Sequence, residues 1–152
     1  MDSCEWVLDT WLLEVAQTPS DPRSLDALAL LHQIKARHRI AIDHDREIWR
    51  QYTKHVQANS HVGVWVRFMI GTSNKIFWRA GRVSSRHEDG LVSILRFDRA
   101  DLVFVGVASN GPDRLIVSED SDYSPEVRTY LETNLGVVVL SVREALDRAL
   151  DP

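Results

Sequence analysis

The sequence predicts an α/β fold, in which a mostly parallel sheet of four or five strands is covered by helices on both faces in three layers, α/β/α. Two observations support this. Short apolar runs rich in β-branched residues alternate with segments whose apolar residues recur every three or four positions. Acidic residues follow several of these runs, where a strand would give way to a helix. With 152 residues, we expect one compact domain over 1–152.

The first half of the chain divides at its prolines and helix-capping residues. The run CEWVLD is apolar and ends at Asp9, which is typical of a buried strand, and Ser24 begins a long segment with helical periodicity. RIAID has the β-branched character of a second strand. We expect these elements in order: a strand ending at Asp9, a helix over 10–17, a loop over 18–24, a helix over 24–38, a strand over 39–43 and a helix over 44–58.

The second half is less regular. Residues 61–71 are apolar nearly all round and favour a helix, whereas the glycines, serines and basic residues of 74–90 favour a surface loop or loose hairpin. Asp98 is positioned to open a helix that runs to about residue 110. The remaining elements are a strand over 113–118, a helix over 124–136 that begins at Ser-Pro and stops at glycine, a strand over 137–140 and a helix over 141–150.

Carboxylates recur at the ends of these elements. Asp9 closes the first strand, Glu47 lies in the helix after the second, Asp101 opens a central helix, and Asp120 and Asp122 follow a later strand. The carboxyl ends of parallel strands share one edge, so these side chains are expected to meet there. Carboxylates held together repel one another and need a cation. Mg²⁺ or Mn²⁺ suits oxygen ligands and phosphate chemistry.

Three stretches together resemble the PIN domain family, whose members are small α/β nucleases. They are VLDTWLL, DRADLVFVGVA and LIVSEDSDY, and their order spans residues 5 to 148. The family pattern has an aspartate that closes strand one and an aspartate that opens a central helix with small residues five and seven positions on. It ends in Thr/Ser-x-Asp-x-Asp-aromatic. The matching positions here are Asp9, Asp101, Gly106, Ala108, Ser118, Asp120, Asp122 and Tyr123.

The resemblance implies a metal-dependent endoribonuclease that cuts single-stranded RNA. Asp9 and Asp101 would be the primary metal ligands, Asp120 would complete the inner shell, and Asp122 would hold a metal-bound water or a second ion. Ser118 would hydrogen-bond Asp9 or a water. A stand-alone domain of this size also resembles toxins or defence effectors that a partner protein or complex holds in check, and the family makes a homodimer plausible.

One position departs from the family pattern. Gln51 stands before Tyr52, where the family has a glutamate, and Glu47 lies one helical turn earlier on the same face and could substitute for it. Otherwise the chain is a catalytically weakened PIN-like domain that binds nucleic acid or a partner protein. A phosphatase using Asp9 as nucleophile is a third class, but Trp11 occupies the position of its expected second aspartate.

Charge is unevenly distributed. The chain has a formal net charge of −4, yet residues 61–100 hold seven basic side chains against three acidic ones, a net charge of +4. Lys75, Arg79, Arg82 and Arg86 are therefore our candidate contacts to a nucleic-acid backbone, and Trp78 could stack on a base. The single cysteine, the lack of a long apolar run and the lack of a secretory signal predict a cytoplasmic protein without a membrane span.

Overall fold

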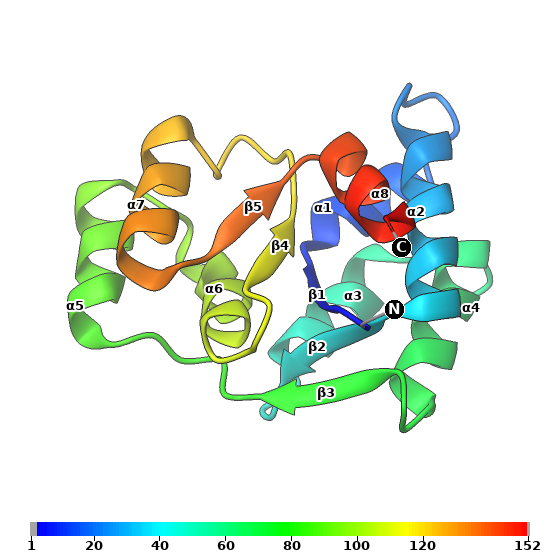
Figure 1. The fold of residues 1–152 in the computed structure, drawn as a ribbon, viewed down its shortest axis with the longest axis horizontal. Helices are drawn as coiled ribbons and strands as arrows, with labels where there is room; N and C mark the ends of the chain where they lie inside the picture. Colours follow the sequence, from blue (N-terminus) through cyan, green and yellow to red (C-terminus); the bar gives the residue numbers. More distant parts are fainter. Residues whose placement is uncertain (1–2, 152) are drawn as a thin grey trace.

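The computed structural model describes residues 3–151 as a five-stranded, all-parallel sheet with helices on both sides (Figure 1). The strands are β1 (Glu5–Leu8), β2 (Arg39–Asp43), β3 (Ile76–Arg79), β4 (Leu115–Val117) and β5 (Val138–Leu140). Their order is β3-β2-β1-β4-β5. The predicted fold class is confirmed. The chain winds outward from β1 first to one side and then to the other, so the crevice between the carboxyl ends of β1 and β4 is the topological switch point, where α/β folds bind ligands.

The helices follow the predicted segments closely. Residues 61–71 are helical, as the sequence predicts, whereas the helix after β2 is shorter than expected. In Figure 1, α2, α4 and α8 gather on one side of the sheet and α5, α6 and α7 on the other. The helices are α1 (Thr10–Ala16), α2 (Ser24–Arg37), α3 (Glu47–His55), α4 (His61–Gly71), α5 (Ser85–Glu88), the π-helix η1 (Asp89–Ile94), the 3₁₀-helix η2 (Arg99–Asp101), α6 (Leu102–Ser109), α7 (Pro125–Leu135) and α8 (Val142–Leu150).

The prediction of a loop or loose hairpin over 74–90 is wrong for residues 76–79 and 85–90. Residues 76–79 form the edge strand β3, in parallel register with β2 from Ile76 opposite Ile40 to Arg79 opposite Asp43. Residues 80–84 are irregular, as predicted, and the chain is then helical, as α5 and η1. An edge strand needs only one partner and protects its open side with charged residues, so its composition resembles that of a loop.

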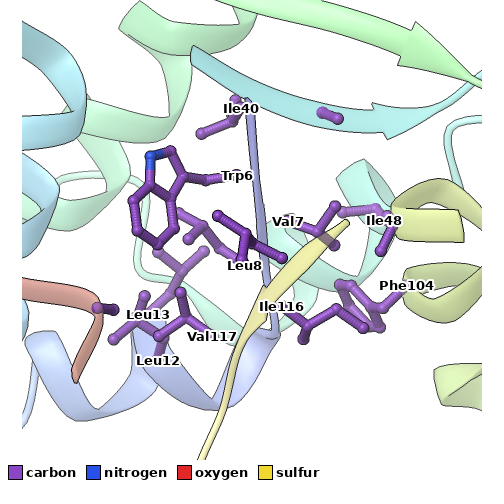
Figure 2. Close-up of a cluster of buried hydrophobic side chains, with 14 of the residues drawn as sticks. Trp6, Val7, Leu8, Leu12, Leu13, Ile40, Ile48, Phe104, Ile116 and Val117 are labelled. Atoms are coloured by element: carbon purple, nitrogen blue, oxygen red, sulfur yellow. The ribbon is translucent and has the colours of Figure 1, made fainter. Parts of the chain in front are cut away.

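The central strand β1 divides the core into two layers. Trp6 and Leu8 lie on one face of the sheet with Leu12 and Leu13 of α1, whereas Val7 lies on the other (Figure 2). The registers of β1 and β4 match this alternation, because Val7 pairs with Ile116 and Leu8 with Val117. Apolar contacts on both faces hold the end of β1 in place, and the residue that follows β1 is Asp9.

Helix α6, which follows directly after Asp101, packs under the segment that leaves β3. A Cβ atom placed on Gly106 would overlap the carbonyl group of Gly81 and come within 2.7 Å of the backbone nitrogen of Arg82. This close approach explains why a small residue stands five positions after Asp101. The backbone-to-backbone contact therefore sets how deeply α6 and the acidic turn before it lie against the sheet.

We expect Gly106→Ala to lower the free energy of unfolding by about 1–3 kcal/mol, because the added methyl group has to displace backbone atoms. Gly71→Ala, at the end of α4, is the matched control, since no atom lies within 4 Å of its added Cβ. Alanine there should be neutral or stabilise by up to about 1 kcal/mol. Urea denaturation of both variants measures the difference, and equal stabilities would contradict the contact.

Candidate acidic site

Asp9 anchors the site at the switch point. It follows β1 directly, and its side chain is only 4% exposed. The Ser118 hydroxyl, which follows β4, donates a hydrogen bond of 2.6 Å to Oδ2 of Asp9, and the Asp120 backbone N–H donates to the same hydroxyl at 3.0 Å. One serine therefore ties the carboxylate after β1 to the loop after β4.

Three further carboxylates form a triad beside Asp9. Ligand oxygens of Asp98, Asp101 and Asp122 all lie within 4.8 Å of one another. Asp98 begins the short helix η2 by accepting from the Ala100 N–H at 3.0 Å, and Asp120 shapes the other loop by accepting from the Asp122 N–H at 3.0 Å. The triad thus joins the turn before α6 to the loop after β4.

The triad and Asp9 share one electrostatic field. The pKa of Asp101 is raised to about 8, chiefly by burial and then by the charges of Asp9, Asp98, Asp122 and Asp120, in that order. Burial likewise raises the pKa of Asp9 to about 6, against the lowering effect of the Ser118 hydrogen bond. Burial and the charge of Asp120 raise the pKa of Asp122 as well. Without a cation, Asp101 therefore keeps a proton at neutral pH.

A buried hydroxyl lies in the same field. Tyr123 is 3% exposed, and its Oη atom has no hydrogen-bond partner among residues 3–151. Burial raises the pKa of Tyr123, and the charges of Asp9, Asp101, Asp120 and Asp122 raise it further. Its ring packs edge-on against Phe97 with centroids 5.1 Å apart, next to Asp98. A buried donor without an acceptor is costly, so it indicates a water or a ligand oxygen bound at this site.

The donor set fits a hard divalent cation. Carboxylate oxygens are the ligands that Mg²⁺ and Mn²⁺ prefer, and oxygens bound to one such ion lie up to about 4–5 Å apart. The triad matches this spacing, and the orphaned hydroxyl of Tyr123 would be satisfied by a water that such an ion carries. The group that could hold a metal is therefore Asp98, Asp101 and Asp122. Asp9 and Asp120, which the sequence predicts as inner ligands, lie outside this group.

Of the two α3 residues considered from the sequence, Gln51 is the one that contacts the site. Its Nε2 donates to the Ala100 carbonyl at 2.9 Å, and its Oε1 accepts from the Thr10 hydroxyl at 3.5 Å. Those two partners adjoin Asp101 and Asp9. The Glu47 side chain is exposed, and in the described part of the chain no contact links it to the triad.

The site roles of two carboxylates do not follow from the sequence. Asp98 is expected chiefly to open a helix, but its spacing of three residues from Asp101 also places it in the triad. Asp43, at the end of β2, is 2% exposed and accepts from the Glu47 and Ile48 N–H groups at 2.9 Å each. Hydrogen bonds to the first turn of α3 therefore account for Asp43 without any metal.

The four predicted nucleic-acid contacts do not share one surface role. Arg79 donates two hydrogen bonds, of 2.9 and 2.8 Å, to the carboxylate of Glu5, which is 5% exposed. Lys75 precedes β3, at the amino edge of the sheet, and its Nζ lies 3.5 Å from the His38 carbonyl. Arg82 and Arg86 are exposed after β3 and stay predicted backbone contacts.

Comparison with known proteins adds no relative. No family model, curated protein or solved structure matches this chain. The resemblance to PIN domains therefore rests on the sequence motifs, and the site rests on its own geometry. Among residues 3–151, no helix is both long and apolar enough to span a membrane.

We expect Arg79→Ala to destabilise the fold by about 3 kcal/mol, because it leaves the Glu5 carboxylate buried without its partner. Arg82→Ala is the control, since that side chain is exposed and its loss should change the free energy of unfolding by less than about 0.5 kcal/mol. Chemical denaturation measures both. If the two variants are equally stable, the Glu5–Arg79 pair has no structural role.

Stability should also depend on pH in a defined direction. The folded-state pKa values of Asp9 and Asp101, about 6 and about 8, lie above the ordinary value of 3.8. The stability that these two groups contribute is therefore full below about pH 4 and is lost as pH rises through 6 and then 8. We expect the free energy of unfolding of the metal-free protein to fall by more than about 1 kcal/mol between pH 5 and 8.5. This loss is smaller than the full pKa shifts would give, because solvent screens the charges.

Thermal unfolding with a chelator measures this loss. Asp101→Asn should remove most of the decline in stability between pH 6.5 and 8.5, because an asparagine side chain does not titrate in this range. Mn²⁺ should restore the stability of the unsubstituted protein at pH 8. A stability that is independent of pH, or that Mn²⁺ does not change, would contradict a strained acidic site.

Proposed function

We propose that this chain is a Mg²⁺- or Mn²⁺-dependent endoribonuclease that hydrolyses phosphodiester bonds in single-stranded RNA. The observation that carries the proposal is the convergence of remote carboxylates at the switch point, beside a buried tyrosine hydroxyl that lacks a partner. The participating residues are Asp9, Asp98, Asp101, Asp120, Asp122 and Tyr123. Their ligand chemistry supports the metal, and the PIN resemblance supports the substrate.

Each residue has a distinct role in this proposal. Asp101, whose pKa is raised to about 8 mainly by burial, would give up its proton as a cation binds, and Asp98 and Asp122 lie beside it. Ser118 fixes the orientation of the Asp9 carboxylate through its hydrogen bond. The bound cation would supply a water of lowered pKa and would stabilise charge that builds on the phosphate. The Tyr123 hydroxyl would orient a water within the pocket.

The biological setting comes from the resemblance alone. A toxin or defence effector in the cytoplasm, held in check by a regulatory protein or complex, is the context that PIN-like domains of this size suggest. A homodimer is part of the same proposal. The exposed Arg82 and Arg86 are the basic side chains best suited to contact the RNA backbone, since Arg79 is engaged with Glu5.

A specific observation favours one second candidate. Gln51 stands where the family has a glutamate, and its amide is already bonded to the Ala100 carbonyl. A neutral side chain there would give a domain that binds nucleic acid or a partner but cuts slowly or not at all. Asp98 argues against this candidate, because it brings another carboxylate close to Asp101.

The test is cleavage of a labelled single-stranded RNA with Mn²⁺. We expect the unsubstituted chain to cut RNA and Asp101→Asn to cut at least about 100-fold more slowly. The asparagine has no negative charge, and an amide nitrogen replaces one of the two oxygens that could bind the metal. Calorimetry should show Mn²⁺ binding to the unsubstituted chain and much weaker binding to Asp101→Asn.

Asp147→Asn is the matched control, since it removes an exposed carboxylate on α8 that pairs with Arg143, away from the acidic site. It should cut RNA and bind Mn²⁺ normally. Binding of Mn²⁺ without cleavage by the unsubstituted chain would favour the second candidate. Cleavage that survives Asp101→Asn, or that needs no divalent ion, would refute the proposed site.

A further inference from the structure

Two tryptophans and an arginine form a stacked cluster on the surface. The guanidinium group of Arg46 lies 5.5 Å from the ring centre of Trp49 and 5.9 Å from that of Trp78. Both indoles are half-buried and Arg46 is exposed. We call Arg46, Trp49 and Trp78 the indole platform. One cation shared by two partly exposed aromatic rings leaves ring surface and guanidinium donors facing solvent.

The platform lies at the same edge of the sheet as the acidic site. Trp78 pairs with Ile42 near the carboxyl ends of β3 and β2, Arg46 follows β2, and Trp49 lies in the first turn of α3. Strand β2 is the neighbour of β1, so β3 is two inter-strand spacings, about 10 Å, from the strand that ends at Asp9. Since β2 alone lies between β1 and β3 (Figure 1), a short polymer held at the acidic site could reach the platform.

The local backbone holds Arg46 in position. Its φ angle is 63°, in the left-handed region, which an arginine adopts at a cost of about 1 kcal/mol or more. The Arg46 N–H donates to the Asp43 carbonyl at 3.1 Å, and the Asp43 carboxylate holds the next turn. Among residues 3–151, no carboxylate forms an ion pair with Arg46. The Arg46 guanidinium is therefore held by the two indole rings rather than by an ion pair.

We propose that the indole platform is a stacking subsite for unpaired bases of the RNA that the acidic site cuts, and this rests on the proposed function. Indole and guanidinium planes stack on any base, at about 1–3 kcal/mol per base. The bases of a duplex are stacked on one another and cannot enter, so the subsite selects single strands. Stacking at a distance from the cleaved bond would also hold the strand in register with the carboxylates.

The charges around the platform indicate how it would bind. The exposed Asp45 and Glu47 offset the positive charges of Arg46 and Arg50. Affinity at this subsite should therefore come from stacking rather than from the release of counterions, and its contribution should change little with salt. A binding surface built on phosphate contacts would behave in the opposite way.

The experiment measures binding of a labelled 12-nucleotide adenosine RNA to the Asp101→Asn chain, which holds the strand without cutting it. Adding Trp78→Leu or Trp49→Leu should weaken binding by about 5- to 100-fold, by the same factor at low and high salt. Neither substitution should change the weak binding of a duplex of equal length. In the chain with an intact acidic site, the substitutions should raise KM for cleavage and leave kcat nearly unchanged.

Phe68→Leu is the matched control, because Lys35 lies 4.4 Å from the Phe68 ring centre in a second exposed cation–aromatic pair. Phe68 is on the last turn of α4, which leads to the amino edge of the sheet, and Lys35 is on α2, so the loss of this pair should leave RNA binding unchanged. Arg46→Ala is a further platform variant that retains both indoles and should also weaken binding. Thermal unfolding of each variant checks that the fold is intact.

The outcomes separate the subsite from the nuclease. If the platform variants bind RNA as tightly as Phe68→Leu, or if the parent chain binds no single-stranded RNA, the subsite is refuted, whatever the unsubstituted chain does with Mn²⁺. If the platform variants lose binding but the unsubstituted chain neither binds Mn²⁺ nor cuts RNA, the subsite stands and the nuclease proposal fails. A loss that is equal for duplex and single strand would also overturn the subsite.

Discussion

Repulsion between carboxylates is the constraint around which the carboxyl edge of this sheet is organised. Hydrophobic packing on both faces of β1 carries Asp9 into a nearly buried position, and the turn before α6 brings Asp98 and Asp101 to the same place. Hydrogen bonds from the Ser118 hydroxyl and from backbone N–H groups offset only part of the resulting negative charge. Protons or a cation have to neutralise the rest of this negative charge. The stability of the fold is therefore linked to what is bound at the site.

Several contacts with no charge of their own keep these carboxylates from moving apart. The backbone approach of Gly106 to Gly81 fixes the depth of α6, and the packing of Tyr123 against Phe97 joins the two loops that carry the triad. Tyr52 donates from its buried hydroxyl to the Leu8 carbonyl and so ties α3 to the end of β1. These three contacts hold the acidic site. They restrict movement of the loops that would otherwise separate the carboxylates and reduce their repulsion.

The sequence predicts the fold class and the main carboxylates because both follow from strong local patterns. An apolar run that ends in aspartate locates Asp9, and the offsets of Gly106 and Ser118 locate the elements around it. The sequence does not reveal the strand β3, because an edge strand with one partner has the composition of a loop. Nor does it show Asp98 as part of the site, because capping a helix already explains an aspartate there.

The choice between Glu47 and Gln51 could not be made from spacing, since residues four apart share a helical face. The rotation of α3 decides it, and that rotation is set by the burial of Ile48 and Tyr52. A glutamate in place of Gln51 would face the Ala100 carbonyl and add a negative charge beside Asp101, whose pKa its neighbours already raise. The glutamine amide instead donates to that carbonyl and steadies the η2 turn. The carboxylates close to Asp101 therefore come from the turn before α6 and the loop after β4, as Asp98 and Asp122, rather than from α3.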